Sequence, residues 1–309
     1  MKAYSIFDDF GAEASEIIRK NGIILDIHPA GVPRPDAVQM QKLLEEYDCI
    51  IIGTSQKISQ DMFEKIETPR IIATASVGID HICIPDEKKH LIRIINTPKA
   101  NAQSVAEFTM ACALSCCKCL AEGSHVYANG KDNKALYRKP EDLFGKTIGV
   151  AGAGNISVRI MEFARFFGMN ILCWTRNPEK HPEVSALGAK FVSLEELADS
   201  ADVISVNLPN HRDTQKIISA SLIEHMKKNA IFISVSRLAT IDLPALLQKA
   251  EAYPEFYVCA DIDPDAEVTK LLSQTGDNVL VTPHIGGGTV ETRKRMFREL
   301  AEAIAALNS

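Results

Sequence analysis

Short apolar runs alternate with amphipathic segments along most of this chain. In the first hundred residues, apolar runs predict strands at Ala3–Phe7, Ile23–Ile27, Cys49–Ile52, Ile71–Ala75 and Ile92–Ile95. Apolar residues at helical spacing predict helices between them, at Ala12–Lys20, Ala37–Glu46, Gln60–Glu67 and Pro85–Lys89. Strands that are separated by amphipathic helices indicate a mostly parallel, doubly wound sheet.

A long apolar segment and a polar segment separate this series from a second one. Asn101–Glu122 predicts a single long, largely buried helix with Asn101 as its N-cap, and Tyr127–Pro140 predicts a surface loop. The second series predicts strands at 147–151, 170–174, 202–206, 230–234, 256–260 and 278–281. It predicts helices at 156–167, 194–199, 221–227 and 243–251. Thr289–Leu307 predicts a last helix, which we expect to pack on the first domain because its apolar residues share one face.

The first strand of the second series ends in a glycine-rich turn. Thr147–Ser157 predicts a strand, a tight turn that contains Gly152 and Gly154, and the start of a helix. A dinucleotide pyrophosphate binds at such a turn, because backbone N–H groups and the positive end of the helix face it. Ser157 takes the place of the third glycine of the usual pattern, where a small side chain still permits close packing.

The position of this turn predicts the domain organisation. About 145 residues precede it, so we expect a nucleotide-binding domain that is inserted into another domain, with the site in the cleft between them. We expect two α/β domains with doubly wound parallel sheets. Residues 1–99 and 286–309 would form a flavodoxin-like substrate domain, and residues 100–285 a Rossmann-like dinucleotide-binding domain.

Composition narrows the class of protein. The chain has 309 residues, 46% of them hydrophobic, which is enough to bury a core in each of two domains. Its formal net charge of −6 argues against nucleic acid as the main partner, since phosphate binding needs a basic face. The first residues turn acidic where a secretory signal would be apolar, and the longest uncharged apolar stretch, Phe108–Cys117, is too short to cross a bilayer.

The chain has eight cysteines. Free thiols in this number indicate a reducing environment, so we expect a cytoplasmic location. Cys112, Cys116 and Cys119 follow helical spacing, which is compatible with a metal site, but no histidine or carboxylate falls on the same stripe. We therefore favour thiols packed as small hydrophobic residues and expect no metal.

The residues after the second strand of this series bear on cofactor choice. A site that prefers NAD has an Asp or Glu here, about 20 residues after the glycine turn, on the ribose 2′-hydroxyl. This chain has Thr175 and Arg176, followed by Asn177. A hydroxyl and a guanidinium favour a 2′-phosphate, which a carboxylate would repel, so we expect NADP to be preferred and NAD to be possible. The alternative is that Arg176 is only a solvated loop charge.

Three later strands end in chemically versatile residues, namely Arg237, Asp261 and His284. In an open parallel sheet, ligands bind beyond the carboxyl ends of the strands. Each residue alone has an ordinary alternative as an ion-paired arginine, a loop aspartate or a loop histidine. All three at strand ends, after a dinucleotide turn, favour a shared site.

Several segments together resemble one family: Ala75–Ile82, Asn96–Glu107, Ser234–Asp242, Ala260–Ile262 and Thr282–His284. The chain resembles the D-isomer-specific 2-hydroxyacid dehydrogenases over nearly its whole length. The resemblance implies hydride transfer between nicotinamide C4 and C2 of a 2-keto acid. Arg237 would hold the substrate carboxylate and polarise the keto oxygen, and His284 would exchange the proton of that oxygen.

The resemblance also implies binding residues. Substrate contacts are expected from backbone N–H groups of Val77 and Gly78, and from Asn101 and Arg237. Asp261 would contact the nicotinamide carboxamide. Cofactor contacts are expected from Ser104, Gly152, Gly154, Asn155, Ile156, Thr175, Arg176, Asn177, Leu208, Pro209, Thr214, Val235, Ser236, Asp261 and Gly286.

Two positions depart from the family pattern. The glutamate that pairs with the histidine is replaced by Ala266, and Glu267 follows directly, with Asp263 and Asp265 nearby. We expect Glu267 to be the third catalytic residue, because a carboxylate beside His284 would favour its protonated form and fix the ring. Leu238 replaces the glycine after the arginine, which would narrow the substrate pocket.

These observations favour an NADP-dependent reductase of small 2-keto acids such as glyoxylate or hydroxypyruvate. A phosphoglycerate dehydrogenase-like enzyme is an alternative in the same class. A nucleotide-sensing binding protein with weak catalysis is an alternative in a different class. As the resemblance implies, we expect a homodimer that forms through the apolar helix near 101–122, and no nucleic-acid or membrane partner.

Overall fold

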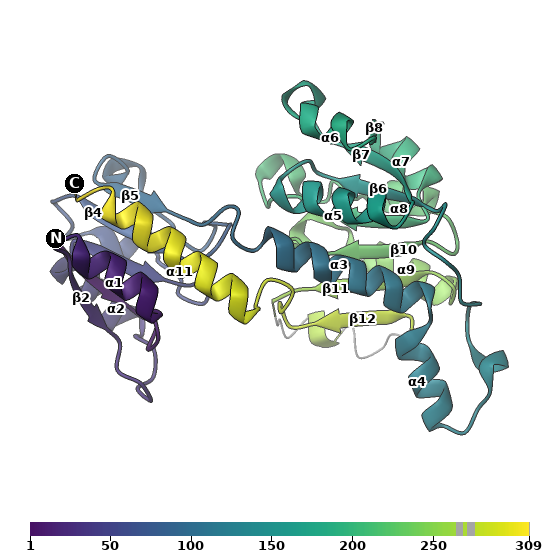
Figure 1. Ribbon diagram of the computed structural model, residues 1–309, viewed down its shortest axis with the longest axis horizontal. Helices are drawn as coiled ribbons and strands as arrows, with labels where there is room; N and C mark the ends of the chain where they lie inside the picture. Colours follow the sequence, from purple (N-terminus) through teal and green to yellow (C-terminus); the bar gives the residue numbers. More distant parts are fainter. Residues whose placement is uncertain (264–267, 271–275, 309) are drawn as a thin grey trace. The chain divides into compact units, whose positions relative to one another are not determined.

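The computed structural model describes residues 1–263, 268–270 and 276–308, which divide into two compact units. Unit 1 comprises Met1–Asn101 and Thr289–Ser309, and unit 2 comprises Ala102–Gly288. Each unit is built on a parallel sheet, so the prediction of two α/β domains with doubly wound parallel sheets is confirmed (Figure 1).

Unit 1 has a five-stranded sheet in the order β2-β1-β3-β4-β5. Its strands are β1 (Lys2–Ser5), β2 (Ile24–Ile27), β3 (Cys49–Ile52), β4 (Arg70–Thr74) and β5 (Ile92–Ile95). Its α-helices are α1 (Ala12–Lys20), α2 (Ala37–Glu46) and α11 (Val290–Ala305). Two predicted helices are wrong in type, because only the 3₁₀ turns η1 (Gln60–Phe63) and η2 (Asp86–Lys88) form within 60–67 and 85–89. Apolar spacing does not distinguish a single 3₁₀ turn from the start of an α-helix.

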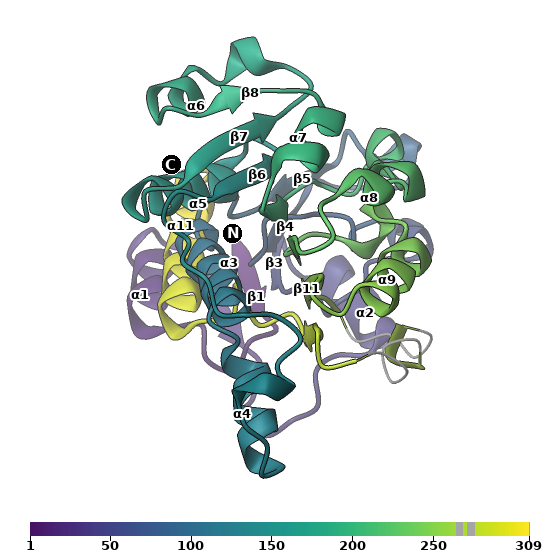
Figure 2. The same cartoon turned by 90° about the vertical axis from the view of Figure 1, so that its right-hand side faces the viewer.

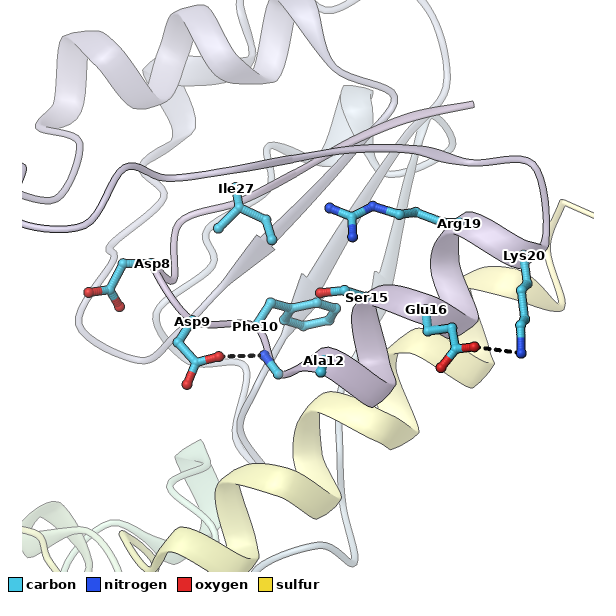
Figure 3. A pocket seen from close by; sticks show the side chains of 10 residues that line it. Asp8, Asp9, Phe10, Ala12, Ser15, Glu16, Arg19, Lys20 and Ile27 are labelled. Atoms are coloured by element: carbon cyan, nitrogen blue, oxygen red, sulfur yellow. Dashed lines mark hydrogen bonds and ion pairs between the residues drawn. The ribbon is translucent and has the colours of Figure 1, made fainter.

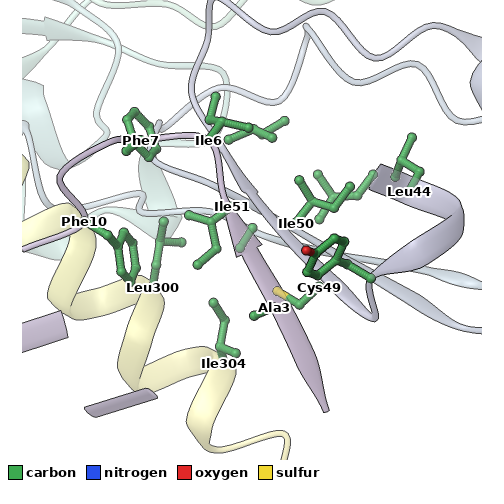
Figure 4. Packing of buried hydrophobic residues seen from close by; sticks show 14 of the residues in the cluster. Ala3, Ile6, Phe7, Phe10, Leu44, Cys49, Ile50, Ile51, Leu300 and Ile304 are labelled. Carbon is green, nitrogen blue, oxygen red and sulfur yellow. The ribbon is translucent and has the colours of Figure 1, made fainter. Parts of the chain in front are cut away.

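Helix α11 returns to unit 1 and completes its core, as the sequence predicts. It lies beside α1 (Figures 1 and 2). The ring of Phe297 lies between those of Phe7 and Phe10, with centroids 4.9 Å from each. Figure 4 shows Leu300 and Ile304 of α11 directed at the same core, which explains why the end of the chain belongs to the unit formed by its beginning.

Unit 2 has a seven-stranded sheet in the order β12-β11-β10-β9-β6-β7-β8. Its strands are β6 (Thr147–Ala151), β7 (Asn170–Trp174), β8 (Lys190–Phe191), β9 (Val203–Val206), β10 (Ile231–Ser234), β11 (Tyr257–Asp261) and β12 (Val279–Thr282). Its helices include α3 (Ala102–Cys117), α4 (Leu120–Ala128), α5 (Asn155–Phe166), α6 (Pro182–Ala186), α7 (Leu194–Ser200), α8 (Ala220–His225) and α9 (Leu243–Ala252). Short 3₁₀ turns are η3 (Asn133–Ala135), η4 (Pro178–Lys180), η5 (Arg212–Thr214) and η6 (Leu238–Thr240).

Helices cover both faces of this sheet (Figure 2). Helices α3 and α5 bury one apolar cluster against it, and α7, α8 and α9 bury a second cluster against the other face. All strand pairs in the sheet are parallel. The carboxyl ends of the strands therefore share one edge, and the loops that follow them bring distant parts of the sequence together.

The predicted single helix 101–122 is wrong, because the chain bends by 50° between α3 and α4. Cys119 has a φ of +51°, a left-handed conformation that ends α3. Glu122 in α4 is buried and accepts a hydrogen bond from the Tyr257 hydroxyl at the start of β11, which holds α4 in its new direction. Helix α4 reaches Ala128, so the predicted loop 127–140 begins later and contains η3.

Two further predictions concern α3. Asn101 directly precedes it, but the Asn101 Oδ1 atom accepts no hydrogen bond from any residue that the structure describes, so the predicted N-cap is wrong. Cys116 and Cys119 are buried and Cys112 is half-buried, as expected of thiols packed as small hydrophobic residues. The Sγ atoms of Cys116 and Cys259 lie 3.4 Å apart.

Candidate active site

The turn after β6 has the geometry that a dinucleotide pyrophosphate needs. Gly152 has a φ of +113°, and a Cβ atom here would lie 2.8 Å from the backbone oxygen of Asn207. Only glycine fits both conditions. Gly154 is the N-cap of α5 and has no side chain to accept from the first N–H groups of the helix. A Cβ at Gly154 would meet nothing within 4 Å, so space remains in front of this helix end. The turn therefore fits a phosphate-bearing cofactor.

Ser157 occupies the position of the third glycine of the usual pattern and fits there because its side chain is small. It is fully buried in the first turn of α5. Its Oγ atom has no hydrogen-bond partner among the described residues. The predicted contacts Asn155 and Ile156 lie beside it and are exposed and half-buried, respectively. The small side chain thus fits the close approach of helix and strand, at the cost of one unsatisfied hydroxyl.

The end of β7 carries an ion pair that sequence reasoning did not predict. The Nη1 atom of Arg176 lies 3.2 Å from Oδ2 of Asp213 in η5. Both side chains are largely exposed, at 49% and 73%. Thr175 is half-buried and Asn177 is exposed. Asp213 therefore competes for the guanidinium that was predicted to bind a 2′-phosphate.

The remaining predicted contacts on this side follow β9. Leu208 is buried and Pro209 is exposed. The Thr214 hydroxyl is buried and donates to the Pro209 carbonyl at 2.6 Å, which ties η5 to the end of β9. The loop that presents Asp213 to Arg176 is therefore held in place by its own hydrogen bonds.

Arg237 follows β10 and precedes η6. Its carbonyl accepts hydrogen bonds from the backbone N and the hydroxyl of Thr240, at 3.0 and 2.8 Å, which fix its backbone. Arg237, Val235 and Ser236 are all half-buried. Leu238, at the place of the expected glycine, begins η6 and is also half-buried.

Asp261 at the end of β11 holds the turn that carries His284. Asp261 is 4% exposed, and its carboxylate accepts from the backbone N atoms of Ile285 and Gly286, at 2.8 and 2.7 Å. It also accepts from the Thr282 hydroxyl at 2.5 Å. A Cβ at Gly286 would lie 2.9 Å from Asp261 Oδ2, so a glycine is needed for this close approach.

His284 has a φ of +52°, which few residues other than glycine adopt. Ile285 and Gly286, which follow His284, donate their backbone N–H groups to Asp261, and these hydrogen bonds hold the conformation of His284. The Nδ1 atom of His284 lies 2.7 Å from Oδ1 of Asp263, two residues after Asp261. The predicted partner Glu267 lies outside the described residues. Asp263, which the sequence also places near the histidine, is the carboxylate among the described residues that contacts it.

In unit 1, the predicted carboxylate-binding loop follows β4. Val77 and Gly78 are half-buried, and hydrogen bonds from the buried Ser76 hydroxyl and from Asn96 after β5 hold the loop. The predicted substrate contact Asn101 is half-buried at the end of this unit. Ser104, a predicted cofactor contact, is buried in α3 of unit 2.

A separate cavity of about 360 Å³ lies in unit 1 beside α1 (Figure 3). Its lining includes Asp8, Asp9, Phe10 and Arg19, and none of the predicted site residues. This cavity is therefore not part of the predicted active site.

Comparison with known proteins identifies the family. The sequence model of one protein family, described as "D-isomer specific 2-hydroxyacid dehydrogenase, NAD binding domain", matches residues 110–286. The hydroxypyruvate reductase of Thermotoga maritima is 33% identical over 270 residues, which is 86% of each chain. This chain belongs to the D-isomer-specific 2-hydroxyacid dehydrogenase family. It is an NAD(P)-dependent enzyme of that family, as the sequence motifs predict.

Other members of the family differ in substrate and length. The D-3-phosphoglycerate dehydrogenase of Methanocaldococcus jannaschii is 30% identical over 268 residues, but the chain spans only 51% of its length. The glyoxylate reductase of Thermofilum pendens is 27% identical over 282 residues, covering 88% of this chain and 82% of the relative.

Solved structures share the fold of this 2-hydroxyacid dehydrogenase. The acyclic imino acid reductase Bsp5, in complex with NADPH and D-Arg, has a TM-score of 0.86 and 22% identity, and covers 99% of this chain and 97% of its own. The D-lactate dehydrogenase of Aquifex aeolicus, complexed with NAD and lactic acid, has a TM-score of 0.81 and 24% identity, and covers 99% and 95%.

Two further findings concern metals and membranes. Within 1–263, 268–270 and 276–308, no group of three or more His, Cys, Asp or Glu residues could hold a metal ion. In the same ranges, no single helix is long and apolar enough to span a membrane. The bent pair α3 and α4 meets the criteria of length and composition only when both helices are counted together.

Proposed function

We propose that this chain is a reductase that uses NADPH to convert a small 2-keto acid, of the size of glyoxylate or hydroxypyruvate, to the D-2-hydroxy acid. One observation carries the proposal. Arg237 follows β10 and His284 follows β12, on either side of β11 and its Asp261. Three neighbouring strand ends thus supply a permanent cation for a carboxylate, a proton donor and the aspartate that holds the turn of that donor.

The residues have distinct roles in this reaction. The cofactor, when bound, supplies the hydride that reduces C2 of the keto acid. Arg237 binds the substrate carboxylate and polarises the keto oxygen with its planar fork of donors. His284 donates a proton to that oxygen. Because Nδ1 of His284 faces Asp263, Nε2 is the nitrogen that serves the substrate.

Unit 2 supplies the cofactor contacts in this proposal. The turn at Gly152 and Gly154 and the start of α5 hold the pyrophosphate. Thr175 and Arg176 hold the 2′-phosphate, and Arg176 must break its ion pair with Asp213 to bind this phosphate. The other expected contacts, including Ser104, Asn177, Leu208, Val235, Ser236 and Asp261, remain proposals. Backbone N–H groups of Val77 and Gly78 receive the substrate carboxylate.

The size of the substrate is supported by the relatives named above. Those that share most of their length with this chain are hydroxypyruvate and glyoxylate reductases. Leu238 adds bulk directly after Arg237, which favours a small acid. The phosphoglycerate dehydrogenase-like alternative would need a site for a phosphate on the substrate.

The test is oxidation of NADPH and NADH with a panel of keto acids: glyoxylate, hydroxypyruvate, pyruvate, 2-ketoisocaproate, phenylpyruvate and phosphohydroxypyruvate. We expect turnover with NADPH on the smallest acids, and loss of turnover with retained NADPH binding in Arg237→Gln. Preference for phosphohydroxypyruvate would favour the phosphoglycerate dehydrogenase-like alternative. NADPH binding with no turnover on any acid would favour the nucleotide-sensing alternative.

We also propose that the chain forms a homodimer through α3 and α4. Leu120 and Tyr127 of α4 are 61% and 84% exposed, an unusual exposure for large apolar side chains. Sedimentation equilibrium would show a dimer in the parent and a monomer after Leu120→Asp with Tyr127→Asp. A monomeric parent would contradict the proposal.

A further inference from the structure

The loop after β4 is held by its carbonyl groups. The carbonyl of Ser76 accepts from the backbone N of Thr97 at 2.9 Å. The carbonyl of Val77 accepts from Nδ2 of Asn96 at 2.7 Å, and that of Gly78 accepts from the Ser76 hydroxyl at 2.7 Å. Three successive peptide groups therefore have their oxygen atoms bound to the scaffold of unit 1.

The N–H groups on the opposite sides of these peptide groups are not used by the scaffold that the described residues of unit 1 form. In a trans peptide the N–H points away from the carbonyl oxygen, so binding each oxygen directs the following N–H to the other side. These are the N–H groups of Val77, Gly78 and Ile79. None of the three donates to another residue in the described part of the chain. A run of such N–H groups is a general anion-binding arrangement.

A directed chain of hydrogen bonds sets the orientation of the Ser76 hydroxyl. Since a carbonyl only accepts, the Ser76 hydroxyl must donate its single proton to the Gly78 carbonyl. The Thr74 hydroxyl, 2.9 Å away, must then donate to Ser76, and His81 Nε2, 3.0 Å from Thr74, must donate in turn. Thr74 and Ser76 are buried, which shields the bond between their hydroxyl groups from water.

We propose that Ser76 and Asn96 are positioning residues for the substrate carboxylate. They hold the loop so that the N–H groups of Val77, Gly78 and Ile79 all face the anion, with Ile79 as a donor beyond the two expected. The proposal rests on the function proposed above, because it assigns the anion as the carboxylate of the 2-keto acid. Neither side chain contacts the substrate itself.

The test compares Ser76→Ala and Asn96→Leu with a matched control. Ser5→Ala removes a buried hydroxyl of the same unit that also donates to a carbonyl two residues on, that of Phe7, but in another loop. For each variant we would measure kcat and KM for the keto acid, KM for NADPH, and the thermal midpoint. Calorimetry in saturating NADP would give the dissociation constant of oxalate, a dicarboxylate that resembles the substrate.

Each loop variant should raise KM for the acid and the oxalate dissociation constant by roughly three- to tenfold, the net worth of one hydrogen bond. We expect kcat and KM for NADPH to stay within about twofold, since unit 2 is unchanged. Ser76→Thr, which keeps the hydroxyl, should restore oxalate binding, and Ser5→Ala should leave it unchanged.

Unchanged KM and oxalate binding in folded Ser76→Ala and Asn96→Leu would overturn the proposal. An equal rise in Ser5→Ala would overturn it too, because the effect would then be one of general stability. Failure of the proposed function would give a different result. If the parent reduced no keto acid but bound oxalate, and both variants bound oxalate more weakly, the positioning role would hold and only the proposed function would be wrong. A parent that neither reduces keto acids nor binds oxalate would remove both.

Discussion

His284 and Asp263 form a pair in which Nδ1 lies 2.7 Å from Oδ1. His284 has a positive φ, which is held because the backbone N–H groups of Ile285 and Gly286 donate to the Asp261 carboxylate. The two aspartates at the end of β11 therefore act on one histidine in different ways. Asp261 sets its backbone, and Asp263 contacts its ring.

The first prediction concerns this ring contact. Asp263→Asn should lower kcat/KM for reduction by on the order of tenfold, because the carboxylate contacts Nδ1 and orients the ring that donates the proton. KM for NADPH should stay unchanged. Initial rates with the keto acid and NADPH, compared with those of the parent, would measure the effect.

Glu267→Gln is the comparison for this experiment. Glu267 is the acid expected from the sequence and lies outside the described residues. If Asp263 is the partner, Glu267→Gln should leave the kcat/KM of the parent unchanged. The reverse result, with Glu267→Gln impaired and Asp263→Asn active, would assign the role to Glu267.

The second prediction concerns cofactor preference. Asp213 lies 3.2 Å from Arg176, so its charge opposes a 2′-phosphate at the same guanidinium. Asp213→Asn should raise the preference for NADPH over NADH by roughly two- to fivefold, the range for an exposed ion pair. The ratio of kcat/KM for the two cofactors would measure it.

Arg176→Asp is the opposite change. It should lower the same ratio by roughly tenfold or more, since a charge-assisted hydrogen bond to phosphate is replaced by repulsion. If neither variant moves the ratio, Arg176 is a solvated loop charge and the proposed NADP preference loses its support.

The third prediction concerns stability at the other end of the unit 2 sheet. Burial raises the pKa of Asp202, but its hydrogen bonds with Lys227 Nζ at 2.6 Å and the backbone N of Thr147 at 2.8 Å outweigh it and lower that pKa. A carboxyl whose pKa is lower in the folded state stabilises the fold above its unfolded pKa. This stabilisation is lost as the pH falls below about 4.

Asp202→Asn should therefore cost on the order of 1–3 kcal/mol of unfolding free energy near pH 7, and much less near pH 3. Urea denaturation at both pH values would measure the difference. Asp61→Asn, at an exposed position in η1, should change stability little at either pH. An Asp202→Asn cost that does not depend on pH would contradict the assignment.

Local signals predicted most of the fold. The strands β3, β5, β6 and β7 and the helices α1 and α2 have the predicted bounds, because a buried strand or an amphipathic helix depends on its own residues. The bend at Cys119 was missed because apolar spacing continues through it. Its cause, the contact between Glu122 and Tyr257, joins residues far apart in the sequence. Helix α6 and the two-residue edge strand β8 were missed because neither is long enough to show a period.

The candidate site shows the same division. Gly152, Arg237 and His284 could be found because a turn or a strand end places them. Their partners could not be found in this way. The contact of Asp213 with Arg176 depends on how η5 is held, and that of Asn96 with Val77 on the packing of two loops. Asp263 lies in the same loop of the sequence, but the expected partner is Glu267, one residue after the family position and outside the described residues.

The last prediction separates the structural and functional roles of the two turn glycines. Gly152→Ala should destabilise the protein by on the order of 1–3 kcal/mol, because alanine disfavours its φ of +113° and its Cβ would lie 2.8 Å from the Asn207 oxygen. Gly154 has an ordinary φ of −76° and open space around its Cβ position. Gly154→Ala should therefore leave the thermal midpoint nearly unchanged.

The two variants should differ again in cofactor binding. In Gly154→Ala the new methyl group lies in front of α5, where the proposed pyrophosphate binds, so the dissociation constant for NADPH should rise in a protein of normal stability. Thermal melting and calorimetric titration of NADPH would measure both properties. If Gly154→Ala bound NADPH as tightly as the parent, the phosphates would not approach this turn closely, and the assignment of the turn as the pyrophosphate site would be wrong.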